Sequence, residues 1–403
     1  MPLKFSDAIS LEVVYKVQET CNINCTYCYM YNVGNDLYKS VPKSSPIETA
    51  VSTANYICDS FSLANLVNVN LIIHGGEPML MPAKQFQSRL DAMEAIFSAR
   101  LTDDQRDSIT LTLQTNATLV SDDWLNLIVE RKIHVGVSID GPKSVHDRQR
   151  IDVRGRGSYD AAIKGVLKLR GAVQDLGVLT VMDPTSDGAE VYKHLTHDLG
   201  FTNLSFLFPF MNWENYNHEV AKGIENFVIS SFSAWLDDVA KGHFVYVRSF
   251  FEALEAAGMI GRDYQGIVDY DVRHLIVVVE SDGTIMPDES MRPTYSERFY
   301  ELNVARNSII DLINDSSFQR LYFAENTTSE ECSSCFLLSA CKSGRTLGRI
   351  GTRFSATDDY SRKSVYCDSY ISLLTRASYV YIAKGSRYFE RLKKNDLVTS
   401  LGA

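Results

Sequence analysis

The sequence predicts an α/β fold built around a parallel sheet. Six short apolar runs alternate with helix-like segments between residues 10 and 210, and each run is rich in β-branched, aliphatic or aromatic residues. With 403 residues, 45% of them hydrophobic, the chain is long enough for a barrel-sized domain and a smaller one. The predicted strands are 11–17, 69–73, 109–113, 133–139, 177–182 and 204–208.

Charge and composition exclude several classes of protein. Lys and Arg total 40 against 50 for Asp and Glu, a formal net charge of −10, which disfavours a nucleic-acid partner. No run of about eighteen apolar residues occurs and the start of the chain lacks a signal-peptide pattern, so we expect a cytoplasmic protein with no membrane partner. Eight cysteines then indicate metal or redox chemistry more than disulfides, because the cytosol keeps thiols reduced.

A closely spaced cysteine triplet follows the first predicted strand. Cys21, Cys25 and Cys28 form a Cys-x3-Cys-x2-Cys pattern. Three thiolates can hold three irons of a [4Fe–4S] cube and leave the fourth iron open for a substrate or cofactor. The alternatives are a zinc site or three unrelated buried thiols. Structural zinc usually takes four ligands, and no His or Cys follows Cys28 closely enough to complete such a set, so the pattern favours an iron–sulfur cluster.

Polar motifs close the second, third and fourth predicted strands. Glycines at a strand end permit close backbone approach and positive φ, as a tightly held polar ligand requires. Because the carboxyl ends of parallel strands meet at one edge, we expect these motifs to lie together near the cysteine triplet. They are residues 74–78 (His-Gly-Gly-Glu-Pro), residues 114–116 (Gln-Thr-Asn), Ser138, Asp140 and Arg150.

The middle of the chain carries less chemistry. Residues 211–265 show helical periodicity, which predicts helices packed beside the sheet. Phe210, Trp213 and Tyr216 could line a peptide groove, but aromatic residues at this density are more often part of a core. Cys58 lies in a helix-like stretch without partner cysteines and is most simply a core residue.

A second cysteine set follows a short hairpin. Apolar runs 275–280 and 284–286 flank Asp282-Gly283, which is a hairpin signal. Cys332, Cys335, Cys341 and Cys367 come next, and four thiolates complete a tetrahedral metal set. Sites made of four cysteines bind either an iron–sulfur cluster or zinc, so both remain open on spacing alone.

The triplet, with Tyr27 just before its last cysteine, and the Gly-Gly-Glu-Pro motif resemble the radical S-adenosylmethionine (SAM) enzymes. The resemblance implies a partial (β/α)6 TIM-like barrel in which a [4Fe–4S] cluster binds SAM. It further implies that residues 75–77 bind the SAM amine and that Ser138 and Arg150 bind its carboxylate, where an Arg fork suits a carboxylate; a surface position is the alternative for Arg150. The implied cofactor-binding residues are Tyr27, His74, Gly75, Gly76, Glu77, Asn116, Ser138, Asp140 and Arg150.

The later cysteines have the spacing of the second auxiliary [4Fe–4S] cluster of the SPASM extension, found on peptide-modifying radical SAM enzymes. The chain departs from the full pattern, because Arg345 stands where a further cysteine is usual and the hairpin runs into Pro287-Asp288-Glu289 without one. The resemblance therefore implies one auxiliary [4Fe–4S] cluster. Asp288 and Glu289 become candidate general bases, with solvated loop carboxylates as the alternative interpretation.

We accordingly expect three regions: a radical SAM partial barrel over 1–210, a helical bridging segment over 211–265, and a SPASM-like auxiliary cluster domain with a C-terminal helix over 266–403. The resemblance also implies two cofactor partners outside the chain, SAM itself and an electron donor such as flavodoxin or ferredoxin. The twenty residues before Cys21 are too few for a winged-helix leader-binding domain, so leader recognition must come from a separate protein or from the core enzyme.

Further segments resemble the SPASM maturases that build three-residue cyclophanes, the triceptide and darobactin-synthase group; among them are Phe208–Trp213 and the Ser-Val-Tyr-Cys run at 364–367. This resemblance implies an oxidoreductase that links an aromatic ring to a nearby Cβ in a ribosomally synthesised precursor peptide, after hydrogen abstraction by a SAM-derived radical. Thioether formation, epimerisation and sulfatase-type maturation are alternatives within the class. An iron–sulfur or zinc binding protein without SAM chemistry is the alternative outside it.

Overall fold

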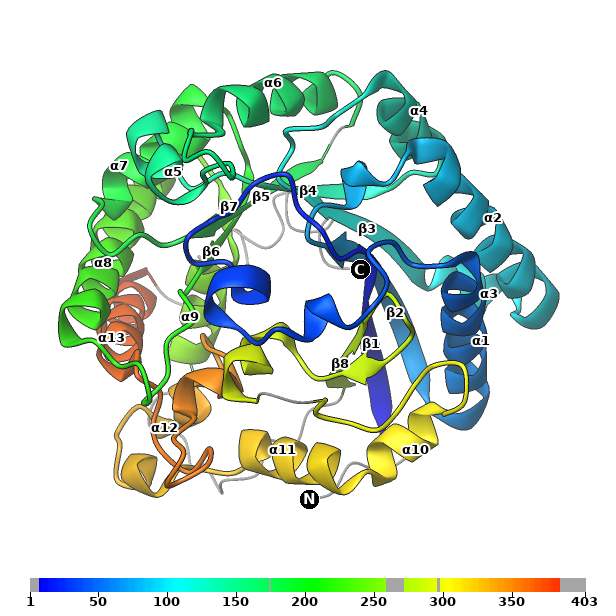
Figure 1. Cartoon of the computed structure of the whole chain (residues 1–403). Coiled ribbons are helices and arrows are strands. Elements are labelled where there is room, and N and C mark those ends of the chain that lie inside the picture. Colours follow the sequence, from blue (N-terminus) through cyan, green and yellow to red (C-terminus); the bar gives the residue numbers. More distant parts are fainter. Residues whose placement is uncertain (1–6, 174, 259–271, 296–297, 385–403) are drawn as a thin grey trace. The chain divides into compact units, whose positions relative to one another are not determined.

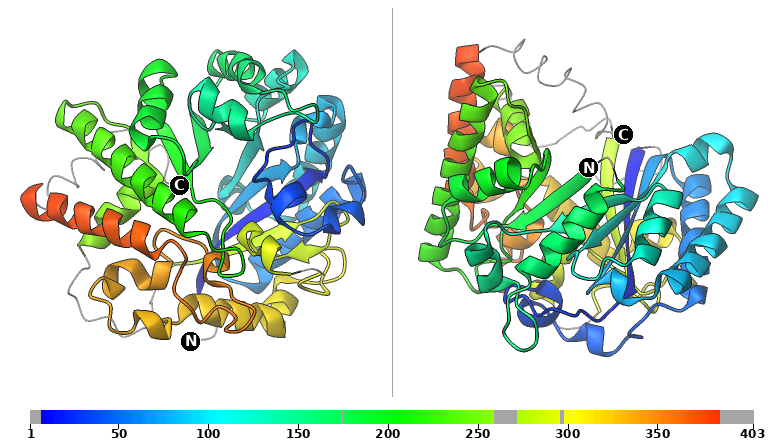
Figure 2. Two further views of the ribbon diagram at one scale, coloured as in Figure 1. Left: turned by 60° about the vertical axis from the view of Figure 1, so that its left-hand side comes forward. Right: turned by 90° about the horizontal axis from the view of Figure 1, so that it is seen from above.

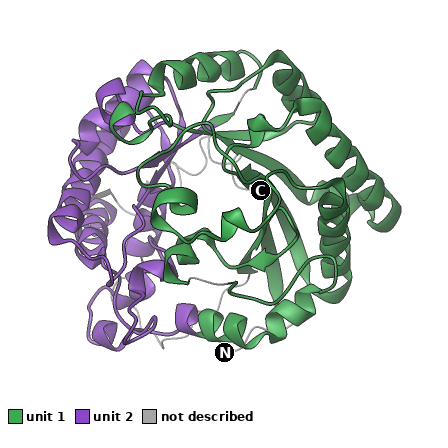
Figure 3. Cartoon of the chain, viewed as in Figure 1, with its two compact units in different colours: residues 1–138, 147–176, 269–323 green, residues 139–146, 177–268, 324–403 purple. Residues whose placement is uncertain are grey.

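The computed structural model describes residues 7–173, 175–258, 272–295 and 298–384. The chain divides into two compact units, shown in Figure 3. Unit 1 comprises residues 1–138, 147–176 and 269–323, and unit 2 comprises residues 139–146, 177–268 and 324–403. In the described part of the chain, no helix has both the length and the apolar character needed to cross a membrane.

Unit 1 is built on a mostly parallel sheet with β1 at its centre. In it β1 pairs in parallel with β2 on one side and with β8 on the other, and the strand order is β4-β3-β2-β1-β8-β9 (Figure 1). Only the short β9 runs antiparallel, beside β8. The strands are β1 Ala8–Gln18, β2 Leu66–Gly75, β3 Ile109–Thr115, β4 His134–Ser138, β8 Val272–Val279 and β9 Ile285–Met286.

Helices of unit 1 follow the strands in sequence and cover the sheet (Figure 1). Helices α1 and α2 pack on each other, and α1 also contacts α10. Local signals define their ends; for example, Ser121 caps α4 by accepting a hydrogen bond from the Trp124 amide. The helices are α1 Ile47–Leu63, α2 Ala83–Arg100, α3 Asp103–Asp107, α4 Asp122–Glu130, α5 Lys143–Gln149, α6 Tyr159–Arg170, α10 Ile309–Asn314 and α11 Ser316–Asn326, with short helices η1 Tyr29–Val33, η2 Leu37–Lys39, η3 Pro78–Leu80 and η5 Glu289–Thr294. Residues 143–146 of α5 and 324–326 of α11 are assigned to unit 2.

Unit 2 combines three parallel strands with a layer of helices. Strands β5, β6 and β7 are neighbours in that order, and α8 packs against both α7 and α13 (Figures 1 and 2). Aromatic rings of Phe206, Phe227, Phe232, Trp235 and Phe250 fill the space between these elements. The elements are β5 Leu176–Val181, α7 Gly188–Lys193, η4 His194–Asp198, β6 Asn203–Leu207, α8 His218–Ala240, β7 Tyr246–Val247, α9 Arg248–Ala257, η6 Glu330–Cys332, α12 Leu338–Cys341, η7 Lys342–Gly344, η8 Ile350–Arg353 and α13 Cys367–Lys384.

The six predicted strands correspond to β1 to β6, and the predicted hairpin corresponds to β8 and β9. The helical periodicity of residues 211–265 corresponds to α8 and α9, while residues 259–265 lie outside the described part. The parallel pairing of β8 with β1 was not predicted, since a hairpin signal says nothing of a partner far away in the sequence. The domain boundaries at 210 and 265 stay a prediction.

Candidate active site

The cysteine triplet occupies the loop that joins β1 to η1. Two backbone hydrogen bonds tie this loop to the segment around Arg150: the Asn24 amide donates to the Ile151 carbonyl at 2.6 Å and the Thr26 amide to the Gln149 carbonyl at 3.0 Å. Burial raises the pKa of the Cys21 thiol to about 12, and the neighbouring Cys25 and Cys28 act in the same direction. The loop therefore gathers the three thiols in one place.

The glycines after β2 lie directly against the end of β1. The Gly76 amide donates to the Gln18 carbonyl at 2.7 Å, and the Glu77 amide donates to the Thr20 carbonyl at 3.0 Å, one residue before the triplet begins. Gly75 has a φ of +133°, and a Cβ there would lie 2.1 Å from the Gln18 oxygen. A Cβ on Gly76 would lie 2.4 Å from the Thr20 carbonyl oxygen and 2.0 Å from the Tyr31 hydroxyl. Both positions therefore require glycine.

Replacing Gly75 by Ala should destabilise the junction, since the new Cβ must displace the backbone of Gln18. We expect a loss of at least about 1–3 kcal/mol in unfolding free energy, measured as a lower thermal midpoint, together with reduced iron loading. Gly155→Ala is the matched control, because Gly155 also has a positive φ of +75°, but a Cβ added there would meet no atom within 4 Å. Equal midpoints for the two variants would contradict the steric argument.

The carboxylate of Glu77 connects the ends of β2 and β3. It is fully buried and accepts hydrogen bonds from Thr115 Oγ1 at 2.7 Å, from the Asn116 amide at 2.8 Å and from the Met79 amide at 3.0 Å. Burial raises its pKa, and these three hydrogen bonds oppose that effect. In the structure Glu77 connects the ends of β2 and β3 through these hydrogen bonds. Its predicted contact with SAM stays a prediction.

Asn116 and Arg150 both reach the cysteine loop. Asn116 Nδ2 lies 3.7 Å from Cys21 Sγ, and Arg150 Nη1 lies 4.0 Å from Cys25 Sγ. The Arg150 guanidinium carbon also lies 5.5 Å from the centre of the Tyr27 ring. Arg150 is 8% exposed, so the surface alternative for this residue is wrong. Donor groups from two further strand connections thus converge on the thiols.

The remaining predicted cofactor contacts are placed less directly. Ser138 ends β4, and its hydroxyl accepts a hydrogen bond from Gln114 Nε2 at 2.9 Å. His74 Nδ1 lies 3.5 Å from the Tyr29 hydroxyl; burial and the Lys16 charge lower the pKa of His74 to about 4, so it is neutral at pH 7. Asp140 belongs to unit 2, where its Oδ1 accepts a hydrogen bond from the Val181 amide at 3.1 Å. Its predicted contact with SAM stays a prediction.

A buried group of charges, which we call the ion cluster, was not found from the sequence. Lys16 Nζ lies 3.0 Å from Glu280 Oε1 and 2.9 Å from Glu289 Oε1, and Arg292 Nη1 lies 3.0 Å from the same Glu280 oxygen. The side chains of Lys16 and Arg292 are 0% and 1% exposed. Glu19 belongs to the ion cluster, and burial raises its pKa to about 8. The sequence feature that could have revealed the ion cluster is Lys16, because a lysine inside an apolar strand needs buried partners of opposite charge.

The ion cluster adjoins the cysteine loop. Helix η5, which carries Glu289 and Arg292, packs on η1, which follows Cys28 directly. Asn35 Nδ2 stabilises the contact between η1 and η5 by donating a hydrogen bond to the Arg292 carbonyl at 3.3 Å. The side chain of Glu289 is only 17% exposed, so the interpretation of Glu289 as a solvated loop carboxylate is wrong. Asp288 instead caps η5, with Oδ1 accepting from the Ser290 amide at 2.9 Å.

Unit 2 brings the four later cysteines together. Cys332 ends η6, Cys341 ends α12 and Cys367 begins α13, while the Cys335 amide donates to the Cys332 carbonyl at 3.0 Å. Burial raises the pKa of Cys341 to about 12, and the charges of the other three cysteines contribute in the same direction. Cys341 Sγ also accepts a hydrogen bond from the Gly344 amide at 3.2 Å. Unit 2 thus places the four cysteines near enough for their charges to interact, and their role as one ligand set stays a prediction.

The segment Phe208–Trp213 packs on the run that leads into Cys367. Tyr366 donates its hydroxyl hydrogen to the Pro209 carbonyl at 2.8 Å, and Trp213 Nε1 donates to the Lys363 carbonyl at 2.8 Å. The Arg362 guanidinium carbon lies 3.8 Å from the centre of the Trp213 ring. Trp213 thus supports the loop that positions Cys367, which agrees with a packing role.

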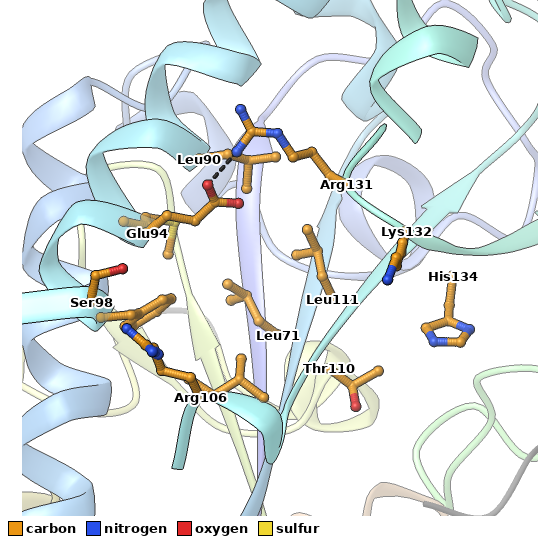
Figure 4. Close-up of a pocket in the computed structure, with 13 residues that line it drawn as sticks. Leu71, Leu90, Glu94, Ser98, Arg106, Thr110, Leu111, Arg131, Lys132 and His134 are labelled. Carbon is orange, nitrogen blue, oxygen red and sulfur yellow. Dashed lines mark hydrogen bonds and ion pairs between the residues drawn. The ribbon is translucent and has the colours of Figure 1, made fainter. Parts of the chain in front are cut away.

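Figure 4 shows a cavity of about 340 Å³ in unit 1 that is separate from these residues. Leu71 and Leu111 line it, together with Arg131, which forms an ion pair with Glu94. The cavity also contacts Ile109 and His134, the first residues of β3 and β4. It therefore lies at the amino ends of the strands, whereas active sites of such folds lie at the carboxyl ends. We do not assign it to the active site.

Residues 15–196 match the family model described as the radical SAM superfamily. This match covers the cysteine triplet, the Gly-Gly-Glu-Pro motif and the strand ends that meet them. The fold and the site are therefore similar to those of the radical SAM superfamily, whose members use a [4Fe–4S] cluster and SAM as cofactors.

The chain is similar along most of its length to anaerobic sulfatase-maturating enzymes. The cysteine-type enzyme of Clostridium novyi (strain NT) is 24% identical over 400 residues, which cover 94% of this chain and 99% of that relative. The serine-type enzyme of Bacteroides thetaiotaomicron is 29% identical over 158 residues, 39% of this chain and 36% of the relative.

A solved structure described as native anSMEcpe with bound AdoMet and Cp18Cys peptide matches with a TM-score of 0.73 and 23% identity, covering 93% of this chain and 98% of that one. This likeness confirms the predicted fold class, a radical SAM α/β fold with a C-terminal auxiliary domain. These relatives are sulfatase-maturating enzymes, and they do not single out the cyclophane builders.

Proposed function

We propose that this radical SAM enzyme installs a C–C cross-link of the cyclophane type between an aromatic ring and a nearby Cβ in a ribosomally synthesised precursor peptide. The observation that carries the proposal is the ion cluster packed beside the first cysteine set, in a chain that holds a second complete cysteine set. Hydrogen abstraction followed by rearomatisation of a ring needs a proton acceptor and an electron acceptor, and these features offer both.

The residues present fit the cofactors of the class. Cys21, Cys25 and Cys28 would hold the SAM-binding [4Fe–4S] cluster, and the Asn116 and Arg150 donors already point at their sulfur atoms. The four cysteines of unit 2 would hold one auxiliary cluster, with the Gly344 amide donating to Cys341. When bound, the first cluster and SAM supply a radical that removes a hydrogen atom, and the auxiliary cluster supplies an acceptor for one electron.

Glu289 is the side chain that we propose as the proton acceptor. Burial raises its pKa above the ordinary glutamate value, with the Lys16 and Arg292 charges acting in the opposite direction, so its affinity for a proton is increased while the pair with Lys16 keeps it oriented. Lys16 stays compensated by Glu280 when Glu289 takes up a proton. Asp288 is committed to capping η5 and is the weaker of the two predicted candidates.

The metal content offers a direct test of the ligand sets. We expect about eight irons per chain after reconstitution, as two cubes of four irons held by cysteine thiolates. Arg345 occupies the position of a further ligand in the full pattern and is used otherwise, with Nη1 donating to Asn326 Oδ1 at 3.1 Å. Iron and sulfide quantitation checks the number; about twelve irons would show a third cube with ligands other than those assigned here.

Sulfatase-type maturation is the second candidate function. The specific observation that favours it is the similarity to the Clostridium novyi enzyme over 94% of this chain. Both candidates begin with the same hydrogen abstraction, and they differ in how the resulting substrate radical reacts.

Coexpression with candidate precursors encoded nearby separates the two functions. Mass spectrometry should show a precursor lighter by two hydrogens, with fragmentation blocked between an aromatic residue and the linked Cβ. A sulfatase peptide carrying Cys or Ser at the modified position serves as the competing substrate. Modification of that peptide, with no change in any aromatic precursor, would refute the cyclophane proposal and support the second candidate.

A further inference from the structure

A group of two histidines and an aspartate on unit 2 lies outside both cysteine sets. His197 Nε2 lies 2.7 Å from Asp238 Oδ2, and His243 Nδ1 lies 3.6 Å from the same oxygen. One ligand atom from each of the three residues comes within 4.8 Å of the other two. Elsewhere in the described part of the chain, no other three His, Cys, Asp or Glu side chains approach one another this closely.

The end of α8 builds this arrangement. The Gly242 amide donates to the Val239 carbonyl at 3.1 Å, and the His243 amide donates to the Asp238 carbonyl at 2.9 Å. These two bonds, with a φ of +83° at Gly242, form a Schellman motif. The motif turns the chain back so that His243 returns over the last turn of the helix, next to Asp238. Helix α7 packs on α8 and continues directly into η4, which carries His197 to the same carboxylate.

The carboxylate is buried while both imidazoles are open to solvent. The side chain of Asp238 is 7% exposed, whereas those of His197 and His243 are 43% and 47% exposed. Tyr192, itself buried, donates its hydroxyl hydrogen to Asp238 Oδ2 at 3.0 Å. Burial would raise the pKa of Asp238, but the hydrogen bonds from His197 and Tyr192 outweigh it and lower the pKa. The aspartate is therefore ionised and oriented by a neighbour at neutral pH.

We propose that His197, Asp238 and His243 form a binding site for a divalent transition-metal ion of the zinc type. Two imidazole nitrogens and one carboxylate oxygen are ligands that such ions prefer, with solvent completing the coordination. Around zinc these ligand atoms would be about 3.3 Å apart, between the 2.7 Å and 3.6 Å that the carboxylate contacts now show. The Tyr192 hydrogen bond is the outer support that metal-bound carboxylates commonly have. The ion would link η4 to the end of α8. This site does not depend on the cysteine sets or on the proposed function.

Zinc binding to the cluster-loaded enzyme tests the site, because the cysteines are then occupied by iron. We expect one Zn²⁺ per chain by calorimetry in competition with a chelator. Zinc absorption spectroscopy should show nitrogen and oxygen ligands at about 2.0–2.2 Å and no sulfur at about 2.3 Å. The thermal midpoint of the enzyme should rise on addition of Zn²⁺, since a ligand that binds only the folded state stabilises it.

Single substitutions test whether these side chains bind the Zn²⁺ ion. His197→Ala and His243→Ala should each weaken Zn²⁺ binding more than about 10-fold and abolish the rise of the thermal midpoint, and Tyr192→Phe should weaken binding by roughly 10- to 100-fold. His218→Ala is the control, because His218 lies at the start of α8 with its side chain 75% exposed and is not part of the group. Sulfur ligands around zinc, no binding of one equivalent, or unchanged affinity in both histidine variants would overturn the site.

Discussion

Replacing Cys25 by Ala should abolish the formation of 5′-deoxyadenosine while leaving the auxiliary cluster in place. The [4Fe–4S] cluster that binds SAM depends on three thiolates, and two are too few to hold it with one iron open. The auxiliary set belongs to unit 2 and keeps its four ligands. Iron content should therefore fall by about half, from about eight to about four per chain, with SAM cleavage at background. The same result is expected for Cys21→Ala and Cys28→Ala.

Cys58→Ala provides the control for that experiment. Cys58 is buried in α1, is 1% exposed and belongs to neither predicted ligand set, so its replacement should retain both clusters and SAM cleavage. Iron and sulfide quantitation together with chromatography of 5′-deoxyadenosine gives both readouts. Formation of 5′-deoxyadenosine by any variant that lacks one cysteine of the triplet would refute the assignment.

Replacing Glu289 by Gln should uncouple hydrogen abstraction from cross-linking. The amide keeps the shape of the side chain beside Lys16 but is a very weak base, and general-base assistance is worth on the order of 10² to 10⁴ in rate. We expect 5′-deoxyadenosine to form at a near-native rate while the yield of cross-linked peptide per 5′-deoxyadenosine falls steeply. Mass spectrometry of the peptide and chromatography of the nucleoside, measured on the same samples, report the ratio.

Asp288→Asn is a matched control for the Glu289 variant. Asparagine caps a helix about as well as aspartate, so the hydrogen bond to the Ser290 amide survives and only the charge changes. We expect its cross-link yield per 5′-deoxyadenosine to equal that of the native enzyme. A loss confined to Asp288→Asn would transfer the role to Asp288, and an unchanged ratio in both variants would show that the proton leaves by another route.

The parts of this enzyme that the sequence revealed are those encoded by short-range spacing. The glycines after β2 and the six strands rest on residues that are close together in the chain, so pattern and period were sufficient. The ion cluster was missed because Lys16 and Glu280 are 264 positions apart, and no local pattern connects them. The His197 site was missed for the same reason, since Asp238 lies 41 positions away and only the packing of α7 on α8 joins them.

The resemblance to radical SAM enzymes indicated which residue types to look for at the site. It said less about which atoms surround each of these side chains. Glu77 was expected at the SAM amine, and the structure shows its carboxylate accepting three hydrogen bonds from the protein itself. Glu289 was weighed as a solvated carboxylate, and burial against Lys16 became visible only once η5 was placed on η1. Burial depends on what covers a side chain, and that covering comes from distant segments.

The position of β1 between β2 and β8 has a consequence for the order of events during synthesis. A ribosome makes about 5–20 residues per second, so β8 and Glu280 follow Lys16 only after a delay on the order of tens of seconds. Until then one edge of β1 lacks its partner strand and the Lys16 charge lacks its counter-charge, which is costly to bury alone. The first strand, and the cysteine loop that continues from it, can therefore reach their final environment only when most of the polypeptide has left the ribosome.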